Sequence, residues 1–216
     1  MSTAPVVPPG RRGPRPRFTR EQVLETALRL IDDCEPGSFT MRRLADEMGM
    51  AVMTLYGYVS SKEELYAAVT AKVFADSPHP PDSDLPWPEQ IRTAVTELHD
   101  IARRHPNLLR IVLSDASPDP GLFSRRERVL AALNTAGFPP DMALHAFGAL
   151  ISFAVGFAVA QGSALRNPPA ATDSTDTPLP AIAAAGAAYA RHLEPEAFDF
   201  GLNLLIDGLR AEGTAR

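Results

Sequence analysis

The sequence is poor in cysteine and lacks the short motifs of common enzymes. Cys34 is the single cysteine among 216 residues, which excludes an intramolecular disulfide and a multi-cysteine zinc site and suits a reducing cytoplasm. No Gly-rich phosphate loop, GxSxG elbow, HExxH pair or clustered pair of acids is present. We therefore expect no enzymatic activity, no metal and no cofactor.

An export signal is also missing, and one segment alone is apolar enough to suggest a membrane. Residues 1–18 contain prolines and arginines where a secretory signal needs a continuous apolar stretch, so we expect a cytoplasmic protein. Residues 142–160 carry no charge and are nearly long enough to span a bilayer. No second such segment exists and the mean hydropathy is −0.08, which favours a buried bundle helix; a membrane-associated helical protein is the alternative.

The net charge of −5 is unevenly distributed. Residues 1–62 carry nine Lys/Arg against seven Asp/Glu, whereas the remaining residues carry twelve against nineteen. Five arginines and no acidic residue fall within residues 1–20, so a disordered basic arm over 1–17 precedes an acidic protein. This asymmetry indicates an anionic partner at the N-terminal end, although a solvated tail has the same composition.

Alternating strand patterns are almost absent, and apolar residues recur with the period of a helix, as at Ile91, Val95, Leu98 and Ala102. We expect an all-α protein with one domain over 18–76 and a second over 77–216, divided at a proline-rich stretch. A loosely ordered loop should follow residue 162, and a short helix at 181–191 is an open alternative. The expected helices lie at about 20–33, 41–49, 52–58, 62–76, 88–104, 106–115, 120–136, 140–162 and 195–209.

Two capping boxes indicate where helices begin. In each, a Ser or Thr hydroxyl and a Glu or Gln side chain three residues later satisfy free backbone N–H groups reciprocally. The pairs are Thr19 with Gln22, and Ser61 with Glu64.

The stretch FTMRRLADEMGMAVMTLYGYVSSKEEL, residues 39–65, carries the most information about function. Two short helices can cross tightly when a small residue lets them approach, a glycine turns the chain and an apolar residue packs the second helix on the first. Ala45, Gly49 and Leu55 supply these three features at offsets of four and ten. The spacing predicts a helix-turn-helix whose second helix can enter the major groove.

Within this stretch, TLYGYVSSKEEL and TMRRLADEMGM resemble the recognition-helix region and the second helix of the TetR (tetracycline-repressor) family. RHPNLL at 104–109 and FDFGLNLLIDGL at 198–209 resemble the family branch with a tetracycline-repressor-like C-terminal domain. The resemblance implies a three-helix helix-turn-helix DNA-binding domain followed by a helical domain for ligand binding and dimerisation.

The resemblance also implies roles for individual residues. Val52, Met53 and Thr54 would face base edges, where Met53 makes apolar contact and Thr54 can donate a hydrogen bond. The residues implied to contact the phosphate backbone are Thr40, Arg42, Tyr56, Tyr58 and Lys62, with Lys62 at the positive end of its helix. Ordinary packing on the first helix is the alternative for the two tyrosines.

Two positions depart from the family pattern. Ala51 leaves the recognition helix without a side-chain cap, a loss of about 1 kcal/mol. Gly57 stands where a larger, often polar or basic side chain is common, and we expect it to loosen the helix by about 1 kcal/mol. Arginines between 11 and 17 could compensate by reaching an adjacent minor groove.

The second domain carries two helical faces suited to a four-helix dimer interface. The first face is a stripe of small residues formed by Gly148, Ser152, Gly156 and Ala160. The second face is apolar and is formed by Phe198, Leu202, Leu205 and Leu209. Residues that could line an effector pocket, with plain core as the alternative, are Trp87, Leu109, Phe123 and Phe153.

The sequence thus predicts a cytoplasmic, homodimeric, ligand-responsive regulator, more specifically a repressor that a small-molecule effector releases from a palindromic double-stranded DNA operator. The main alternative is an all-α small-molecule-binding protein without DNA-binding activity.

Overall fold

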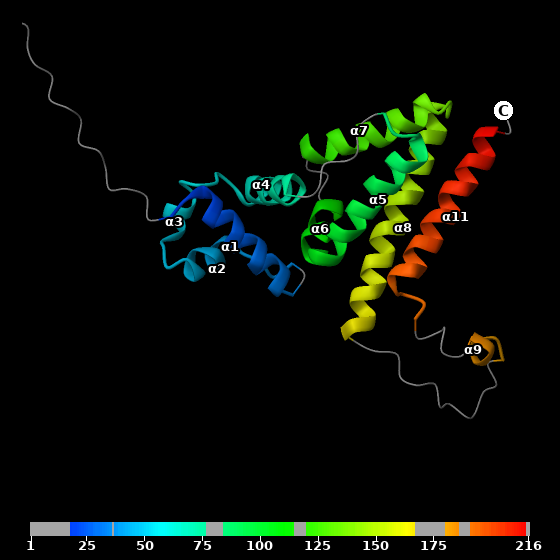
Figure 1. Cartoon of the computed structure of the whole chain (residues 1–216). Helices are drawn as coiled ribbons and strands as arrows, with labels where there is room; N and C mark the ends of the chain where they lie inside the picture. The colour runs from blue at the N-terminus through cyan, green and yellow to red at the C-terminus, as the bar shows by residue number, and fades with distance from the viewer. Residues whose placement is uncertain are drawn as a thin grey trace, which may run out of the picture.

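The computed structural model describes residues 18–35, 37–76, 84–114, 120–166, 180–185 and 191–214, and every regular element within these ranges is an α-helix. The all-α prediction is therefore confirmed. Figure 1 shows α1–α4 gathered at one end of the molecule and α5–α11 at the other; we call residues 18–76 the head and residues 84–214 the body. The helices are α1 (Arg20–Asp33), α2 (Met41–Glu47), α3 (Val52–Leu55), α4 (Lys62–Ala75), α5 (Trp87–Arg104), α6 (Pro106–Ser114), α7 (Pro120–Thr135), α8 (Pro140–Arg166), α9 (Pro180–Ala185) and α11 (Pro195–Thr214).

Most predicted helix bounds agree with the structure to within a few residues, and three do not. The recognition helix α3 ends at Leu55 instead of residue 58, for a reason given below. α8 continues to Arg166, so residues 163–166 are helical where a loop was predicted, and α11 continues to Thr214. The predicted arm over 1–17 and the rest of the predicted loop lie outside the described residues.

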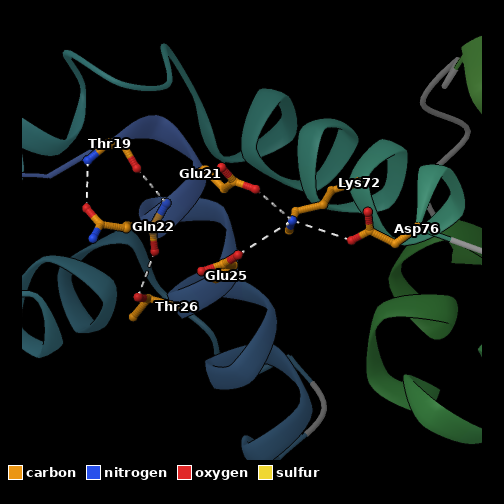
Figure 2. Close-up of polar contacts among 7 residues, drawn as sticks. All are labelled: Thr19, Glu21, Gln22, Glu25, Thr26, Lys72 and Asp76. Atoms are coloured by element: carbon orange, nitrogen blue, oxygen red, sulfur yellow. Dashed lines mark hydrogen bonds and ion pairs between the residues drawn. The ribbon is translucent and has the colours of Figure 1, made fainter.

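Side-chain caps start three helices of the head, and two of these caps belong to the predicted capping boxes. The Thr19 hydroxyl accepts from the Gln22 N–H at 3.2 Å and the Gln22 side chain accepts from the Thr19 N–H at 2.8 Å, so the first capping box is confirmed (Figure 2). Ser61 caps α4 by accepting from the Glu64 N–H at 3.1 Å. The reciprocal bond predicted for Ser61 is wrong by one residue, because the Glu64 carboxylate accepts from the N–H and the hydroxyl of Ser60 instead.

The core of the head is built from the apolar faces of its four helices. Leu44, Ala45, Leu55 and Leu65 are fully buried, and Val23 of α1 closes the cluster from the other side. Each helix is too short to be stable alone, so this shared burial is what holds the head together.

The body is centred on α5, which packs along α8, with α7 and α11 on either side (Figure 1). α8 contributes the small buried residues Ala143, Ala146 and Ala154 to the core that it shares with α5, α7 and α11. The largest buried side chains around them are Ile91, Leu133, Leu150, Leu202 and Ile206.

The prediction for the apolar face of α11 is wrong for Phe198 and Leu202, whereas Leu205 and Leu209 are half-buried and their place in an interface stays a prediction. Phe198 and Leu202 are buried against the core of their own chain, so they cannot form an interface with a second chain. The apolar residues that α11 leaves exposed are Phe200 and Leu204, with 65% and 59% of their surface accessible.

Residues 140–164 of α8 form a helix long and apolar enough to cross a membrane by length and composition, with a mean hydropathy of 1.9. One such helix is weak evidence for a membrane span, because the core helix of a soluble protein passes the same test. Within one chain 28% of its most apolar window is buried, so much of this apolar surface still needs a cover.

Polar contacts join the body to the head. The Asn107 amide of α6 donates to the carbonyls of Ile31, Asp32 and Cys34 at 3.1, 3.1 and 2.8 Å, which satisfies carbonyl groups that the end of α1 leaves free. His105 Nδ1 lies 2.7 Å from the Asp32 carboxylate. The RHPNLL segment therefore fixes the C-terminal end of α1 on the body.

Candidate nucleic-acid interface

The turn between α2 and α3 has the geometry that the sequence spacing predicts. Gly49 adopts a φ of +62°, a conformation that L side chains rarely take, and its N–H donates to the Asp46 carbonyl at 3.1 Å. The next N–H, from Met50, reaches the Ala45 carbonyl at 3.0 Å. Ala45 and Leu55 are completely buried where the two helices meet. The helix-turn-helix is thereby confirmed.

The recognition helix is a single turn with no side-chain cap at Ala51, as expected from the sequence. It ends early because the N–H groups of Gly57 and Tyr58 bond three residues back, to Thr54 and Leu55, and tighten the chain. A Cβ at Gly57 would lie 3.1 Å from the Thr54 carbonyl oxygen. The predicted loss of helix stability at Gly57 is therefore wrong, since this glycine lies in a tight turn after the helix.

The surface around α3 is exposed on the side opposite Leu55. Met53 is 80% exposed, Tyr56 is 41% exposed, and Thr54 is also exposed, whereas Val52 is half-buried. Met53 is therefore accessible to another molecule, although a single exposed apolar side chain is common on protein surfaces. Arg42 of α2 is exposed as well.

Three of the predicted phosphate contacts already have partners inside the head. Thr40 accepts from the Arg43 N–H at 3.1 Å and caps α2, which leaves its hydroxyl proton available. Lys62 Nζ donates to the Phe39 carbonyl at 2.9 Å, which leaves two ammonium protons for other acceptors. Tyr58 donates its single hydroxyl proton to the Phe18 carbonyl at 3.1 Å, so a phosphate contact through that proton requires this bond to break.

Charged groups hold α1 against the C-terminal half of α4 (Figure 2). Lys72 Nζ lies 3.4, 3.6 and 3.4 Å from carboxylate oxygens of Glu21, Glu25 and Asp76. Desolvation alone would lower the pKa of Lys72, but hydrogen bonds and charges from Glu21 and Asp76 outweigh it and raise that pKa above its usual value.

The Glu64 carboxylate supports the start of α4 in the same way. Its pKa lies below the usual range, because the Ser60 hydroxyl and N–H donate to it and Arg20 lies 3.3 Å away. Glu64 is therefore ionised at neutral pH and keeps the loop before Lys62 in place.

The body contains a cavity of about 100 Å³ between α4, α5, α7 and α8. Its wall is mostly apolar and includes one ion pair, between Glu97 of α5 and Arg125 of α7. Sequence reasoning missed both residues, because they are 28 positions apart and neither belongs to a short motif. The lining residues are Phe74, Gln90, Ala94, Val95, Glu97, Leu98, Arg125, Arg126, Arg128, Val129, Phe147, Leu150 and Ile151.

Three of the predicted pocket residues, Trp87, Leu109 and Phe153, lie elsewhere in the body. Leu109 is buried in a small cluster with Ala102 and Ala158, and Phe153 stacks on Phe198 with ring centroids 5.2 Å apart. Trp87 packs edge-on against Phe138. Phe123 belongs to α7, but its side chain lies outside the described part of the chain. Effector contact by these residues stays a prediction.

A head of four helices with an exposed recognition helix, joined to a helical body that contains a cavity, defines a helix-turn-helix regulator. Residues 23–69 match the family model "Bacterial regulatory proteins, tetR family", and residues 77–212 match "Tetracyclin repressor-like, C-terminal domain". The second match covers more than half of the chain. The protein therefore belongs to the TetR family and is a ligand-responsive DNA-binding transcriptional regulator.

Individual relatives agree with this assignment. The chain is 31% identical over 151 residues to the transcriptional repressor DrrR1 of Streptomyces coeruleorubidus, a match that covers 69% of this chain and 56% of the relative. It is 28% identical over 207 residues to the class D tetracycline repressor protein of Escherichia coli, with 92% of each protein covered. Among solved structures, BioQ in complex with its natural double-stranded DNA operator superposes with a TM-score of 0.61 at 25% identity, covering 90% of this chain and 99% of BioQ.

Proposed function

We propose that the protein is a cytoplasmic, non-enzymatic repressor that binds a palindromic operator as a homodimer and leaves it when a small molecule enters the body. The observation that carries this proposal is the exposed surface of α3 and the residue after it, where Met53, Thr54 and Tyr56 are exposed while Leu55 is fully buried in the head. Two such heads would enter successive major grooves about 34 Å apart. The repressor names of DrrR1 and the tetracycline repressor, and the operator bound to BioQ, support this proposal.

Each predicted contact has a specific part in this proposal. Val52, Met53 and Thr54 read bases from the leading turn of the recognition helix, where Met53 and Thr54 are exposed and Val52 is half-buried. Contacts to the DNA backbone come from Thr40, Arg42, Tyr56, Tyr58 and Lys62. Lys62 is the strongest of these candidates, since the Phe39 carbonyl holds its ammonium group at the N-terminal end of α4, where the helix dipole also favours an anion.

The homodimer would use the exposed faces of α8 and α11. Gly148, Ser152 and Gly156 follow one exposed line of α8, and a Cβ at either glycine would meet nothing within 4 Å in the same chain. Phe200 and Leu204 supply the exposed apolar side chains on α11. A partner helix against the small residues would cover the apolar surface that a single chain leaves open.

Release by an effector needs a mechanical connection between body and head, and two sets of contacts supply it. Asn107 bonds the end of α1, and Arg125 donates to the Phe74 carbonyl near the end of α4 at 2.6 Å. A ligand that changes how α5, α6 and α7 pack would therefore change the angle of the head and the spacing of the two recognition helices.

The test uses the full-length protein and a labelled duplex that contains the inverted repeat nearest to its own gene. Fluorescence anisotropy against a scrambled duplex should give at least about 10³-fold preference for the repeat at physiological salt, two protomers per site, and an affinity that falls steeply with added salt. Equal affinity for both duplexes, or no binding to either, would leave the small-molecule-binding alternative as the function.

A further inference from the structure

Glu97 is a buried carboxylate with one satisfied oxygen and one unsatisfied oxygen. Its side chain is 6% exposed, and Oε2 pairs with Arg125. Oε1 is buried and has no hydrogen-bond partner in the described part of the chain. Buried polar atoms in folded proteins almost always have a partner, so this oxygen marks a place where a donor is missing.

The same residue lines the body cavity. Around it the wall is apolar and aromatic, with Leu98, Phe147, Leu150 and Ile151 among the lining residues. The volume of about 100 Å³ is smaller than that of the apolar cavities of about 150 Å³ that bind a benzene ring, so the site suits a single small ring. The cavity is therefore an apolar space for one small ring, and its wall includes the residue that carries the unsatisfied acceptor.

The charges on the wall decide which donor suits this site. Arg125, Arg126 and Arg128 all line the cavity, and Glu97 is the single acidic residue among the lining residues. A cationic ligand would meet three guanidinium groups and compete with Arg125 for Glu97. An anionic group would be repelled by the negative charge of the Glu97 carboxylate. A neutral hydroxyl satisfies the oxygen without either penalty.

Arg125 links this cavity to the DNA-binding head. One arm of its guanidinium group pairs with Glu97, and Nη2 donates to the Phe74 carbonyl at 2.6 Å. The group also lies 4.7 Å from the centroid of the Phe74 ring. Phe74 belongs to the last turn of α4, the helix whose first residue is Lys62. Two hydrogen bonds, both made by Arg125, therefore connect the Glu97 carboxylate to α4 of the head.

We propose that the cavity binds a neutral, mainly apolar, ring-containing effector whose hydroxyl group donates to Glu97 Oε1, and that Arg125 passes its occupancy to α4. The proposal rests on the proposed ligand-responsive function and specifies the chemistry of its ligand. Arg125 acts as a positioning residue, since it is held between the acceptor and the head.

The first experiment measures binding of phenol to the full-length protein by calorimetry, with anisole, in which a methyl group replaces the hydroxyl proton, as a probe that has no donor. We expect phenol to bind about tenfold more tightly than anisole, as one hydrogen bond to a charged acceptor allows. Benzoate and benzylamine, which carry an anion and a cation, should bind more weakly than phenol. Anisole equal to phenol, or a charged probe tighter than phenol, overturns the proposal.

Glu97→Gln is the matched variant for this measurement. Its amide oxygen must face the Arg125 donors, so its NH₂ group replaces the acceptor in the cavity while the volume stays the same. The variant should therefore bind phenol and anisole with about equal affinity. If Glu97→Gln unfolds, the double variant Glu97→Leu/Arg125→Leu is used instead. It removes both charges together, a replacement that proteins tolerate well, and should also lose the preference for phenol over anisole. A preserved preference in the folded variant overturns the proposal.

The second experiment tests the link to the head. The ratio of operator affinities without and with saturating phenol is measured for the wild type, for Arg125→Lys and for Arg92→Lys. Arg92 bonds Asn203 on the surface of the body and does not line the cavity, so its variant should keep the wild-type ratio. Lysine at 125 cannot pair with Glu97 and reach Phe74 together, so its ratio should fall toward one while phenol still binds.

The two proposals fail in different ways. Loss of operator binding by the wild type without phenol contradicts the repressor function. Operator binding that phenol leaves unchanged, or an Arg125→Lys ratio equal to that of the wild type, contradicts only the inference about Glu97 and Arg125.

Discussion

The Asn107 side-chain amide donates to the main-chain carbonyl of Cys34 at 2.8 Å, across 73 positions of sequence. The same NH₂ group also reaches the Ile31 and Asp32 carbonyls, so one side chain of the body closes the C-terminal end of the first helix of the head. The position of the head on the body therefore depends on a polar contact that a single substitution removes.

Asn107→Ala should lower the free energy of unfolding by about 1–3 kcal/mol, because carbonyl groups at the end of α1 lose their donor. Urea denaturation followed by circular dichroism measures the change. Asn134→Ala, at an exposed position of α7, is the control and should change stability by less than about 0.5 kcal/mol. Similar stabilities for the two variants would show that water replaces the Asn107 contact.

Lys62→Ala should weaken binding to operator and scrambled DNA by similar factors and flatten the salt dependence by about one unit per half-site, since one phosphate contact releases about one counterion. Binding is measured by anisotropy at several salt concentrations. Arg210→Ala removes one positive charge from α11, far from the head in sequence, and should leave the slope unchanged. If Lys62→Ala keeps the salt dependence of the wild type, Lys62 does not contact a phosphate and has only the structural bond with the Phe39 carbonyl.

Thr54→Ala should cost about 1–3 kcal/mol on the operator and little on scrambled DNA, because the hydroxyl lies on the exposed face of α3 where a base edge is read. Thr54→Ser keeps the hydroxyl and should retain most of the affinity for the operator. Equal losses on both DNAs would assign Thr54 to the phosphate backbone.

Gly156→Leu should lower the fraction of dimer and, with it, the affinity for the operator, since two linked heads bind one site more tightly than two separate heads. The glycine Cα is open to the surface in one chain, so the leucine disturbs a partner chain without disturbing its own core. Glu127→Leu adds the same side chain to an exposed position of α7 and serves as control. Sedimentation velocity that shows a full dimer for Gly156→Leu would place the interface elsewhere.

Gly201→Ala should destabilise each chain by about 1–3 kcal/mol, because the added Cβ would lie 2.6 Å from Cζ of Phe153. The Phe153 ring cannot move away easily, since it stacks on Phe198 and tilts against Phe157. In a Phe153→Leu background the same Gly201→Ala change should cost almost nothing. Thermal unfolding of the four proteins gives this coupling energy, and additive effects would contradict the close contact.

Local chemistry made much of the head predictable from the sequence. The Thr19 box begins α1 where expected, and Ala45, Gly49 and Leu55 take the positions that their sizes and the positive φ of the glycine demand. These features depend on residues within a few positions of one another, so the order of the amino acids determines them.

The sequence by itself determined the all-α class, most helix bounds and the helix-turn-helix, because these follow from local hydrogen bonds and from the period of apolar residues. Only the tertiary structure decided which faces of the helices are used. α11 is apolar on more than one side, so periodicity alone could not show that Phe198 and Leu202 face the core while Phe200 and Leu204 face outward. The meeting of Glu97 with Arg125, and the orphan oxygen beside the cavity, likewise depend on how α5 packs against α7, which no local pattern in the chain encodes.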